Sequence, residues 1–402
     1  MRMKSTRSFK IFLLGAIVLS LPACGGGGSG LDDVDVIATS IVITDEASLR
    51  SAIDLAQNAE VISLGGASIS VSDTIEITKP ITLQGPGTLN VTKYSSVLKL
   101  SANGIKIKGI TFANPQGLRF EGVGPCGTRA GPVNPTIGVV VNASNVEISN
   151  STFDQFLNGI STQNTDGAFS SLLISGNKFQ KMFASGYDWC GGAAVSINIP
   201  RTIVINNSFS QEDNPESMMG ARGIWIGGGA TDTEVSLNTI DGIYFDAITV
   251  NSGAPRHLIR GNTTNGSGIG VNNSSDVTVT NNRVVVKSAI SRDPGNPDPP
   301  FHRAGVRVFN SPRVEISSNQ LLMAFTTNRL EGAGPQEVRE GIQINGGVNS
   351  IIRENTIGYP SASNRIPDLL RYAIAFFGNY EGFLMESNQI DPVLANQENN
   401  LP

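Results

Sequence analysis

Residues 268–284 read GIGVNNSSDVTVTNNRV and contain both halves of a repeat that recurs along most of the chain. The first half, GIGV, is a small residue followed by alternating inward and outward positions, which is typical of a short β-strand. The second half ends in Asn282, an asparagine two residues before the apolar Val284. We call these two halves the strand anchor and the asparagine anchor.

Both anchors recur with a characteristic spacing. The strand anchor occurs at 138–141, 159–162, 194–197, 223–226, 247–250, 268–271, 305–308, 341–344 and 373–376. The asparagine anchor supplies Asn177, Asn207, Asn238, Asn262, Asn282, Asn319, Asn355 and Asn388. The arc from strand to asparagine is 12 to 14 residues in seven repeats, whereas the arc from asparagine to the next strand varies from 7 to 24 residues. One fixed arc and one elastic corner predict a solenoid with loops inserted at that corner. Stacked asparagines are expected to hydrogen-bond along its axis.

The repeat resembles that of right-handed parallel β-helix proteins of the pectate-lyase type, over roughly residues 42 to 392. The implied fold is all-β, a right-handed parallel β-helix of about ten coils in a single domain at 41–402. The segment TDEASLRSAIDLAQNAEVISL (44–64) predicts a short amphipathic helix followed by a strand. In that family such a helix covers the open end of the solenoid, and we expect the same here.

The first forty residues resemble a targeting signal rather than part of the fold. A basic start is followed by the apolar run IFLLGAIVLSL, then LPAC and GGGGSG. This resembles a bacterial lipoprotein signal peptide at 1–23, with Cys24 as the lipidated residue and 24–40 as a flexible tether. Gly25 favours the outer membrane, so we expect a lipid-anchored protein at the cell surface or in the periplasm. An ordinary cleaved secretory signal is the alternative.

Charge and cysteine content restrict the partners. The formal net charge is −5, or about −9 without the four basic residues of the signal, and no basic stripe is present. Nucleic acid is therefore not expected as a partner. Cys126 and Cys190 remain in an oxidising compartment, so we predict a disulfide, with two free thiols as the alternative. The protein is expected to be a monomer.

The tetrapeptide Asn-Thr-Asp-Gly at 164–167 resembles a catalytic motif of polygalacturonases. In that family the aspartate lies two residues before the first inward residue of a strand, a position that Asn158 occupies here. Asp166 instead follows the strand anchor, and the other polygalacturonase signatures are missing. We therefore expect Asp166 to lie in a turn.

Candidate site residues fall into columns on consecutive coils, which are about 4.8 Å apart. The outward position of the strand anchor gives Trp225, Arg307 and Gln343, and the position two before the first inward residue gives Arg222, Asp246 and Glu340. Arg303 and Arg339 lie one residue before the second column, with His302 beside Arg303. We expect these residues on one side of the solenoid, in a groove between loops at the elastic corner.

Each of these residues also has a structural interpretation. The arginines indicate an anionic ligand, because guanidinium groups hold carboxylates in a forked geometry, but they can equally pair with Glu331, Glu337 and Glu340. Trp225 either stacks on a sugar ring or packs under the loop at 210–221. Arg222 and Asp246 can form a surface ion pair, and His302 can pack against the prolines before it. His257 is expected to be structural.

β-Elimination from a uronic acid needs a cation beside the carboxylate and a base at the adjacent carbon. Arg307 and Arg339 are candidates for the first role, and His302, Tyr244 or an arginine for the second. Asp246 and Glu340 are expected to be roughly 14 Å apart, too far for the paired acids of a hydrolase. Calcium-dependent pectate lyases use clustered acids, and no such cluster is evident, so calcium is left open and no metal ligand is predicted.

We therefore predict a polysaccharide lyase that acts on an acidic, uronate-containing polymer. Two alternatives remain at this point. One is a glycoside hydrolase on the same fold, and the other is a non-catalytic polysaccharide-binding or cell-envelope protein.

Overall fold

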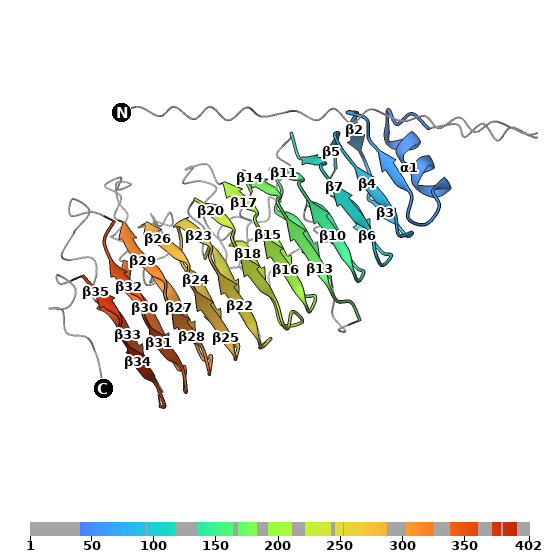
Figure 1. Ribbon diagram of the computed structural model, residues 1–402. Helices are drawn as coiled ribbons and strands as arrows, with labels where there is room; N and C mark the ends of the chain where they lie inside the picture. Colours follow the sequence, from blue (N-terminus) through green and yellow to red (C-terminus); the bar gives the residue numbers. More distant parts are fainter. Residues whose placement is uncertain are drawn as a thin grey trace, which may run out of the picture. The chain divides into compact units, whose positions relative to one another are not determined.

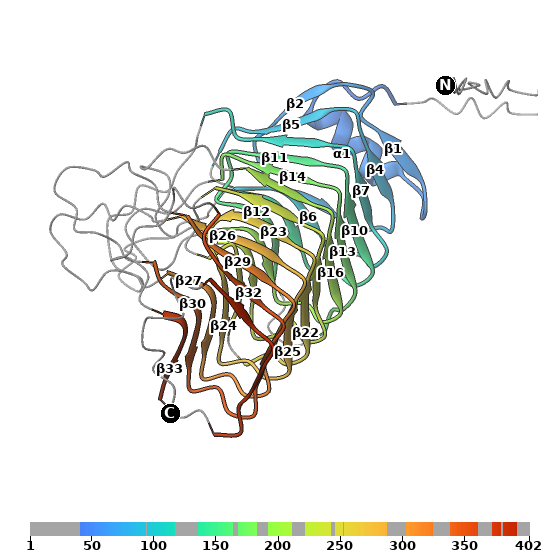
Figure 2. The same ribbon diagram turned by 60° about the vertical axis from the view of Figure 1, so that its left-hand side comes forward.

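The computed structural model describes residues 41–93, 95–116, 136–163, 168–182, 192–210, 222–242, 246–251, 253–287, 303–324, 338–360, 372–378 and 381–391. They belong to one compact unit, Ile41–Pro402. Its chain coils through three parallel sheets, and each turn adds a strand to each sheet (Figure 1). Figure 2 shows the three sheets as the faces of this coil. The predicted parallel β-helix is confirmed.

The strands of each sheet follow one another along the stack. Sheet A contains β1 (Val61–Ser63), β4 (Thr82–Gln84), β7 (Lys106–Lys108), β10 (Val146–Ser149), β13 (Leu172–Ser175), β16 (Thr202–Ile205), β19 (Glu234–Ser236), β22 (His257–Arg260), β25 (Val277–Thr280), β28 (Glu315–Ser317), β31 (Ile351–Arg353) and β34 (Leu384–Glu386). Sheet B contains β2 (Ser68–Val71), β5 (Thr88–Val91), β8 (Thr111–Ala113), β11 (Thr152–Asp154), β14 (Lys178–Gln180), β17 (Ser208–Ser210), β20 (Thr239–Asp241), β23 (Thr263–Gly266), β26 (Arg283–Lys287), β29 (Gln320–Ala324), β32 (Thr356–Gly358) and β35 (Gln389–Ile390). Sheet C contains β3 (Ile75–Ile77), β6 (Ser96–Leu100), β9 (Ile137–Val141), β12 (Asn158–Thr162), β15 (Ala193–Ile197), β18 (Arg222–Ile226), β21 (Ile248–Val250), β24 (Ile269–Asn272), β27 (Arg303–Phe309), β30 (Val338–Asn345) and β33 (Tyr372–Phe377).

The number of coils is larger than expected. Sheets A and B have 12 strands each and sheet C has 11 among the described residues, whereas the sequence predicted about ten coils. The additional strands lie before residue 114, ahead of the first strand anchor that the sequence analysis identified, at 138–141. The anchors therefore identify the regular part of the coil and miss its beginning.

Helix α1 (Glu46–Leu55) confirms the predicted N-terminal helix. Asp45 caps it, because its carboxylate accepts a hydrogen bond of 2.8 Å from the backbone N–H of Ser48. At the other end, the Lys79 ammonium donates to the backbone oxygens of Asp54 and Ala56. Leu49 and the rest of the buried stripe join the core of the first coils, and Figure 1 shows the helix at that end.

The small first residue of each strand anchor has a steric cause. A Cβ atom added at Gly223 would lie 2.5 Å from the backbone oxygen of Ala247 on the next coil. At Gly341 it would lie 2.6 Å from the backbone oxygen of Ala373. Distances this short exclude any side chain at these two positions, so both strand anchors must begin with glycine.

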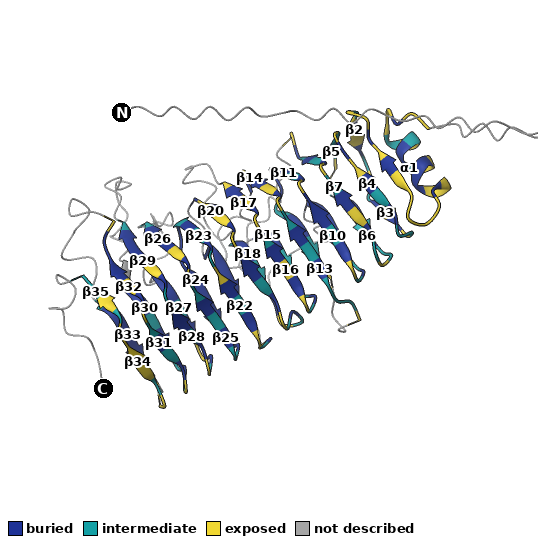
Figure 3. Ribbon diagram, in the orientation of Figure 1, coloured by how far each residue is buried: buried dark blue, intermediate teal, exposed yellow. Residues whose placement is uncertain are grey.

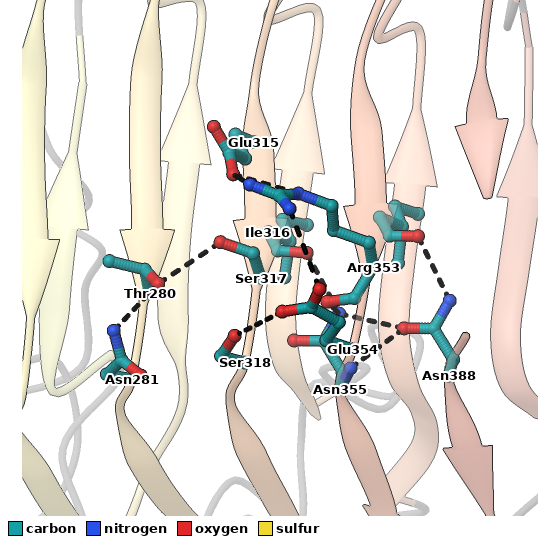
Figure 4. A network of polar contacts seen from close by, with 11 residues as sticks. Thr280, Asn281, Glu315, Ile316, Ser317, Ser318, Arg353, Glu354, Asn355 and Asn388 are labelled. Carbon is teal, nitrogen blue, oxygen red and sulfur yellow. Dashed lines mark hydrogen bonds and ion pairs between the residues drawn. The ribbon is translucent and has the colours of Figure 1, made fainter. Parts of the chain in front are cut away.

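The asparagine anchors form the predicted ladder at the corner between sheets A and B. From Asn177 to Asn388, each side-chain amide donates to the Oδ1 atom of the next asparagine at 3.0 Å. Each of these Oδ1 atoms also accepts a hydrogen bond of 2.9–3.0 Å from the backbone N–H of the preceding asparagine in the ladder. Figure 4 shows the end of the ladder, Asn355 and Asn388, beside the ion pair between Arg353 and Glu315. The ladder thus satisfies the backbone of the same turn in coil after coil.

Ion pairs stabilise the opposite corner, between sheets C and A. Arg256 forms two bonds to Asp232, of 2.5 and 2.7 Å, and Arg313 forms two bonds of the same lengths to Asp276. The hydrogen bonds from these arginines lower the pKa of Asp232 and of Asp276 to about 2. Both carboxylates are more than a third exposed, so solvent screens each pair and its contribution to the stability of the fold is small.

The two ion pairs at this corner should make the midpoint temperature of unfolding depend on pH. The folded-state pKa of each aspartate lies below its unfolded value, so the stabilisation is present above about pH 4 and is lost as pH falls towards 2. We expect the double variant Asp232→Asn, Asp276→Asn to melt below the unchanged chain at pH 7 and to lose less between pH 4 and pH 2. Thermal unfolding followed by circular dichroism measures both. An identical pH slope in the two chains would contradict the assignment.

Candidate functional site

The outward side chains of sheet C form the column that the sequence predicted. Trp225 pairs with Thr249, Thr249 with Gly270, Gly270 with Arg307, and Arg307 with Gln343 on successive coils. Trp225, Arg307 and Gln343 are half-buried at the surface, and Figure 3 colours their strands mainly buried or intermediate. The shared register of these three residues is therefore confirmed. Their roles stay a prediction.

An ion pair bridges two coils at the centre of this column. Nη2 of Arg307, on β27, lies 3.1 Å from Oδ2 of Asp246, which precedes β21. The Thr249 hydroxyl donates to the same Oδ2 at 3.1 Å. Gly270 lies on the intervening strand, and a Cβ atom there would be 2.7 Å from Oδ2 and 3.5 Å from Nη2. The missing side chain at position 270 thus makes room for the bridge.

Arg222 adds a second guanidinium to this pair. Burial lowers the pKa of Arg222, Asp246 raises it and Arg307 lowers it, so all three charges act on one another. Asp246 was paired with Arg222 in one interpretation of the sequence, but its ion pair is with Arg307, two coils away. Two guanidinium groups therefore act on this one carboxylate, and such groups can hold the carboxylate of a ligand in a forked geometry.

The Trp225 side chain lies along its strand towards the carboxyl end. A Cβ atom at Gly227 would be 2.7 Å from Cη2 and 2.9 Å from Cζ3 of the indole. The ring therefore lies over Gly227, where the next outward side chain would otherwise be. Residues 211–221, under which the ring was alternatively expected to pack, lie outside the described residues.

A further column, which the sequence analysis missed, runs along this carboxyl end of sheet C. Asn272 pairs with Phe309, Phe309 with Asn345, and Asn345 with Phe377. Phe309 and Phe377 are 39% and 37% exposed, which is unusual for phenylalanine. We define the amide–aromatic strip as Asn198, the Trp225 ring over Gly227, Asn251, Asn272, Phe309, Asn345 and Phe377. The missed signal was the residue directly after each strand anchor, as in GVRVF and AIAFF.

The two predicted carboxylates differ in their surroundings. Glu340, on β30, is only 2% exposed and pairs in register with Ala304. Asp246 is 8% exposed and belongs to the ion pair described above. They lie three coils apart, about 14 Å, as the sequence spacing predicted. This separation does not suit the two acids of a glycosidase.

His257 lies away from sheet C and fits its predicted structural role. It is 2% exposed, and its Nε2 donates to the backbone oxygen of Ala254 at 2.8 Å. Burial lowers the pKa of His257 to about 4, so the ring is neutral at physiological pH.

Several predicted site residues are not fully described by the structure. His302, Tyr244, Cys126, Cys190 and Cys24 lie outside the described residues, as do Glu331, Glu337 and Asp166. Arg303 and Arg339 are placed in β27 and β30 by their backbone alone. The segment around Asp166 joins β12 to β13, at the corner between sheets C and A. The disulfide, the lipid anchor and the base therefore stay predictions.

The described residues offer no group of three His, Cys, Asp or Glu side chains that could hold a metal ion. The same part of the chain contains no helix long and apolar enough to span a membrane.

Comparisons with known proteins agree with this architecture. A family model described as a right-handed β-helix region matches residues 136–321. The fold is thus a right-handed parallel β-helix. The chain has no significant sequence match among curated proteins.

Solved structures give the same fold at low sequence identity. The A-module of mannuronan C-5 epimerase AlgE4 from Azotobacter vinelandii superposes with a TM-score of 0.54 at 13% identity, over 88% of this chain and 95% of that one. A tailspike protein of E. coli bacteriophage HK620, solved with a pentasaccharide, has a TM-score of 0.59 at 14% identity, over 88% of this chain and 64% of that one. DFA-IIIase from Arthrobacter chlorophenolicus A6, solved with DFA-III, has a TM-score of 0.55 at 12% identity, over 86% and 93%. The likeness is one of fold.

Proposed function

We propose that this protein is a carbohydrate-active β-helix protein that cleaves an acidic polysaccharide by β-elimination on the surface of sheet C. The observation that carries the proposal is the cluster of Arg222, Asp246 and Arg307, which lies with Trp225 within four successive coils of sheet C. Guanidinium groups neutralise a uronate carboxylate, and an aromatic ring beside them packs against a sugar. The positively charged groups and the aromatic ring lie on the same surface of sheet C. That surface runs along the axis of the solenoid and therefore suits an extended polysaccharide chain.

The structural neighbours support a carbohydrate ligand. One is an epimerase of mannuronan, and another was solved with a bound pentasaccharide. Because fold alone does not determine activity, the residues of sheet C have to distinguish elimination from other reactions.

The chemistry assigns separate roles to the side chains. Arg307 and Arg222 bind the uronate carboxylate, which makes the C–H group at the adjacent carbon more acidic and stabilises the enolate formed when the base removes that proton. The enolate then forms the carbon–carbon double bond and expels the glycosidic oxygen at the next carbon, which takes up a proton from the conjugate acid of the base or from water. Asp246 holds the Arg307 guanidinium in place through the 3.1 Å contact. Arg339 is a further candidate for the carboxylate, and His302 or Tyr244 for the base. Arg303, Glu340 and Gln343 are candidates for substrate binding.

The test is the appearance of an unsaturated product. Purified protein is incubated with polygalacturonate, alginate and hyaluronate, and ultraviolet absorbance reports the conjugated double bond that elimination creates. Arg307→Gln is expected to lower the rate by about 10²- to 10³-fold, because it removes a charge that stabilises the transition state. Gly270→Val keeps both charged groups, yet should also slow the reaction, because its Cβ would displace the Asp246 carboxylate.

Arg313→Gln is the matched control. Arg313 lies on the same coil as Arg307 and also forms an ion pair, but at the corner between sheets C and A. It should leave the rate unchanged. New reducing ends without the absorbance would identify a hydrolase, and binding without either would identify a non-catalytic protein. Either result would replace the lyase proposal.

A further inference from the structure

The amide–aromatic strip continues the candidate site along the axis of the solenoid. The rings of Trp225, Phe309 and Phe377 belong to β18, β27 and β33. The first two strands are three coils apart and the last two are two coils apart, which corresponds to about 14 and 10 Å. Half-buried amides occupy the same outward position on the coils between them, at Asn251, Asn272 and Asn345.

Turn chemistry explains only part of this composition. The residues that follow the strip have left-handed backbone conformations, with φ values of 50° at Asn273, 45° at Asn310 and 76° at Gly378. Asparagine is common beside such turns, so the amides have a local cause. Phenylalanine has no role in a turn, and exposing two rings in one column gives up the free energy gained by burying them. A ligand that covers both rings accounts for their position.

We propose that the amide–aromatic strip binds neutral sugar residues that neighbour the uronate in the same polymer. This inference rests on the proposed function, because the uronate is placed at Arg307, one outward position before Phe309 on β27. Pyranose rings present C–H groups on their faces and hydroxyl groups at their edges. The three aromatic rings contact the faces, and the amides between them donate to and accept from the hydroxyls. The substrate class is then an acidic heteropolysaccharide rather than a pure polyuronate.

Binding measurements on single variants test the strip. Titration calorimetry is performed with oligogalacturonate, with the neutral oligosaccharides of mannan, galactan and β-glucan, and with oligosaccharides of xanthan and gellan, which contain both uronate and neutral sugars. Phe309→Ala and Phe377→Ala are each expected to weaken binding of a mixed oligosaccharide by about tenfold, as is typical for loss of one aromatic contact. Leu384→Ala is the control, because Leu384 is 46% exposed but lies on sheet A. It should bind as the unchanged chain does.

The outcomes separate this inference from the proposed function. If Arg307→Gln abolishes binding of oligogalacturonate while the phenylalanine variants bind every sugar normally, the strip is refuted and the charged site stands. If the phenylalanine variants lose neutral sugars while Arg307→Gln changes nothing, the strip stands and the uronate site is refuted. Failure to bind any of these sugars overturns both. Concentration-dependent self-association that disappears in Phe309→Ala would assign the strip to a protein interface and overturn the inference.

Discussion

Replacing Asn262 by alanine is expected to lower the free energy of unfolding by about 3 to 5 kcal/mol, because several buried groups lose their partners at once. The Asn262 amide donates to the backbone oxygens of Val235 and Arg260 and to Oδ1 of Asn282. Its own Oδ1 accepts from the backbone and side chain of Asn238. Asn262 is 0% exposed, so water does not replace these bonds.

Asn388 provides the matched control for this prediction. It closes the ladder, is only partly buried, and donates to the backbone oxygen of Ile352. Asn388→Ala should lower the free energy of unfolding by about 1 to 2 kcal/mol, because water can hydrogen-bond to the groups that lose the Asn388 side chain as a partner. Urea unfolding followed by circular dichroism measures both variants. Equal losses at positions 262 and 388 would mean that the ladder contributes no more than ordinary turn bonds.

Replacing Phe179 by alanine is expected to cost about 3 to 5 kcal/mol through the cavity that it leaves. Four phenylalanine rings stack inside sheet B, and Phe179 lies between Phe153 and Phe209, with centroid distances of 4.9 and 4.7 Å. The side chain is 0% exposed. A Cβ atom at Gly159 would lie 2.8 Å from this ring, so the surrounding backbone already packs tightly against it. The variant should unfold at a lower urea concentration.

Phe309→Ala tests whether the stability lost in Phe179→Ala comes from removing a buried core side chain. The same atoms are removed, but Phe309 is 39% exposed on the outer face of sheet C. Its stability should change by about 0.5 kcal/mol or less, as is usual for a surface substitution. A large loss at position 309 would show that the ring packs against the protein, and the binding role of the strip would fail with it.

The fold could be predicted because each coil repeats the same local causes. The strand anchor carries the alternation that fills the core, and where its first residue is glycine the next coil passes within 3 Å of where a Cβ would be. The asparagine anchor marks a turn that only a stacked amide satisfies in this way. The length of the fixed arc then determines the register, so the column of Trp225, Arg307 and Gln343 followed from the sequence.

The site was less predictable because it depends on contacts between coils that the repeat does not encode. Spacing favoured a pair between neighbouring coils, whereas Arg307 reaches Asp246 across a strand whose residue at that position is Gly270. The spacing of the anchors in the sequence also gave no reason to extend the column of outward residues beyond the end of each strand anchor, so Phe309 and Phe377 were missed. The orientation of the Trp225 ring follows from the empty space over Gly227, which is a three-dimensional property.

The unequal corners of the coil have a consequence for how such proteins can diversify. The asparagine ladder fixes one corner through hydrogen bonds that the coils from Asn177 to Asn388 share, whereas the connections from sheet B to sheet C differ in length from coil to coil. A connection at that corner can be exchanged between proteins without altering any ladder bond. A descendant chain can therefore acquire a new specificity by replacing one insertion, while its inherited scaffold stays unchanged.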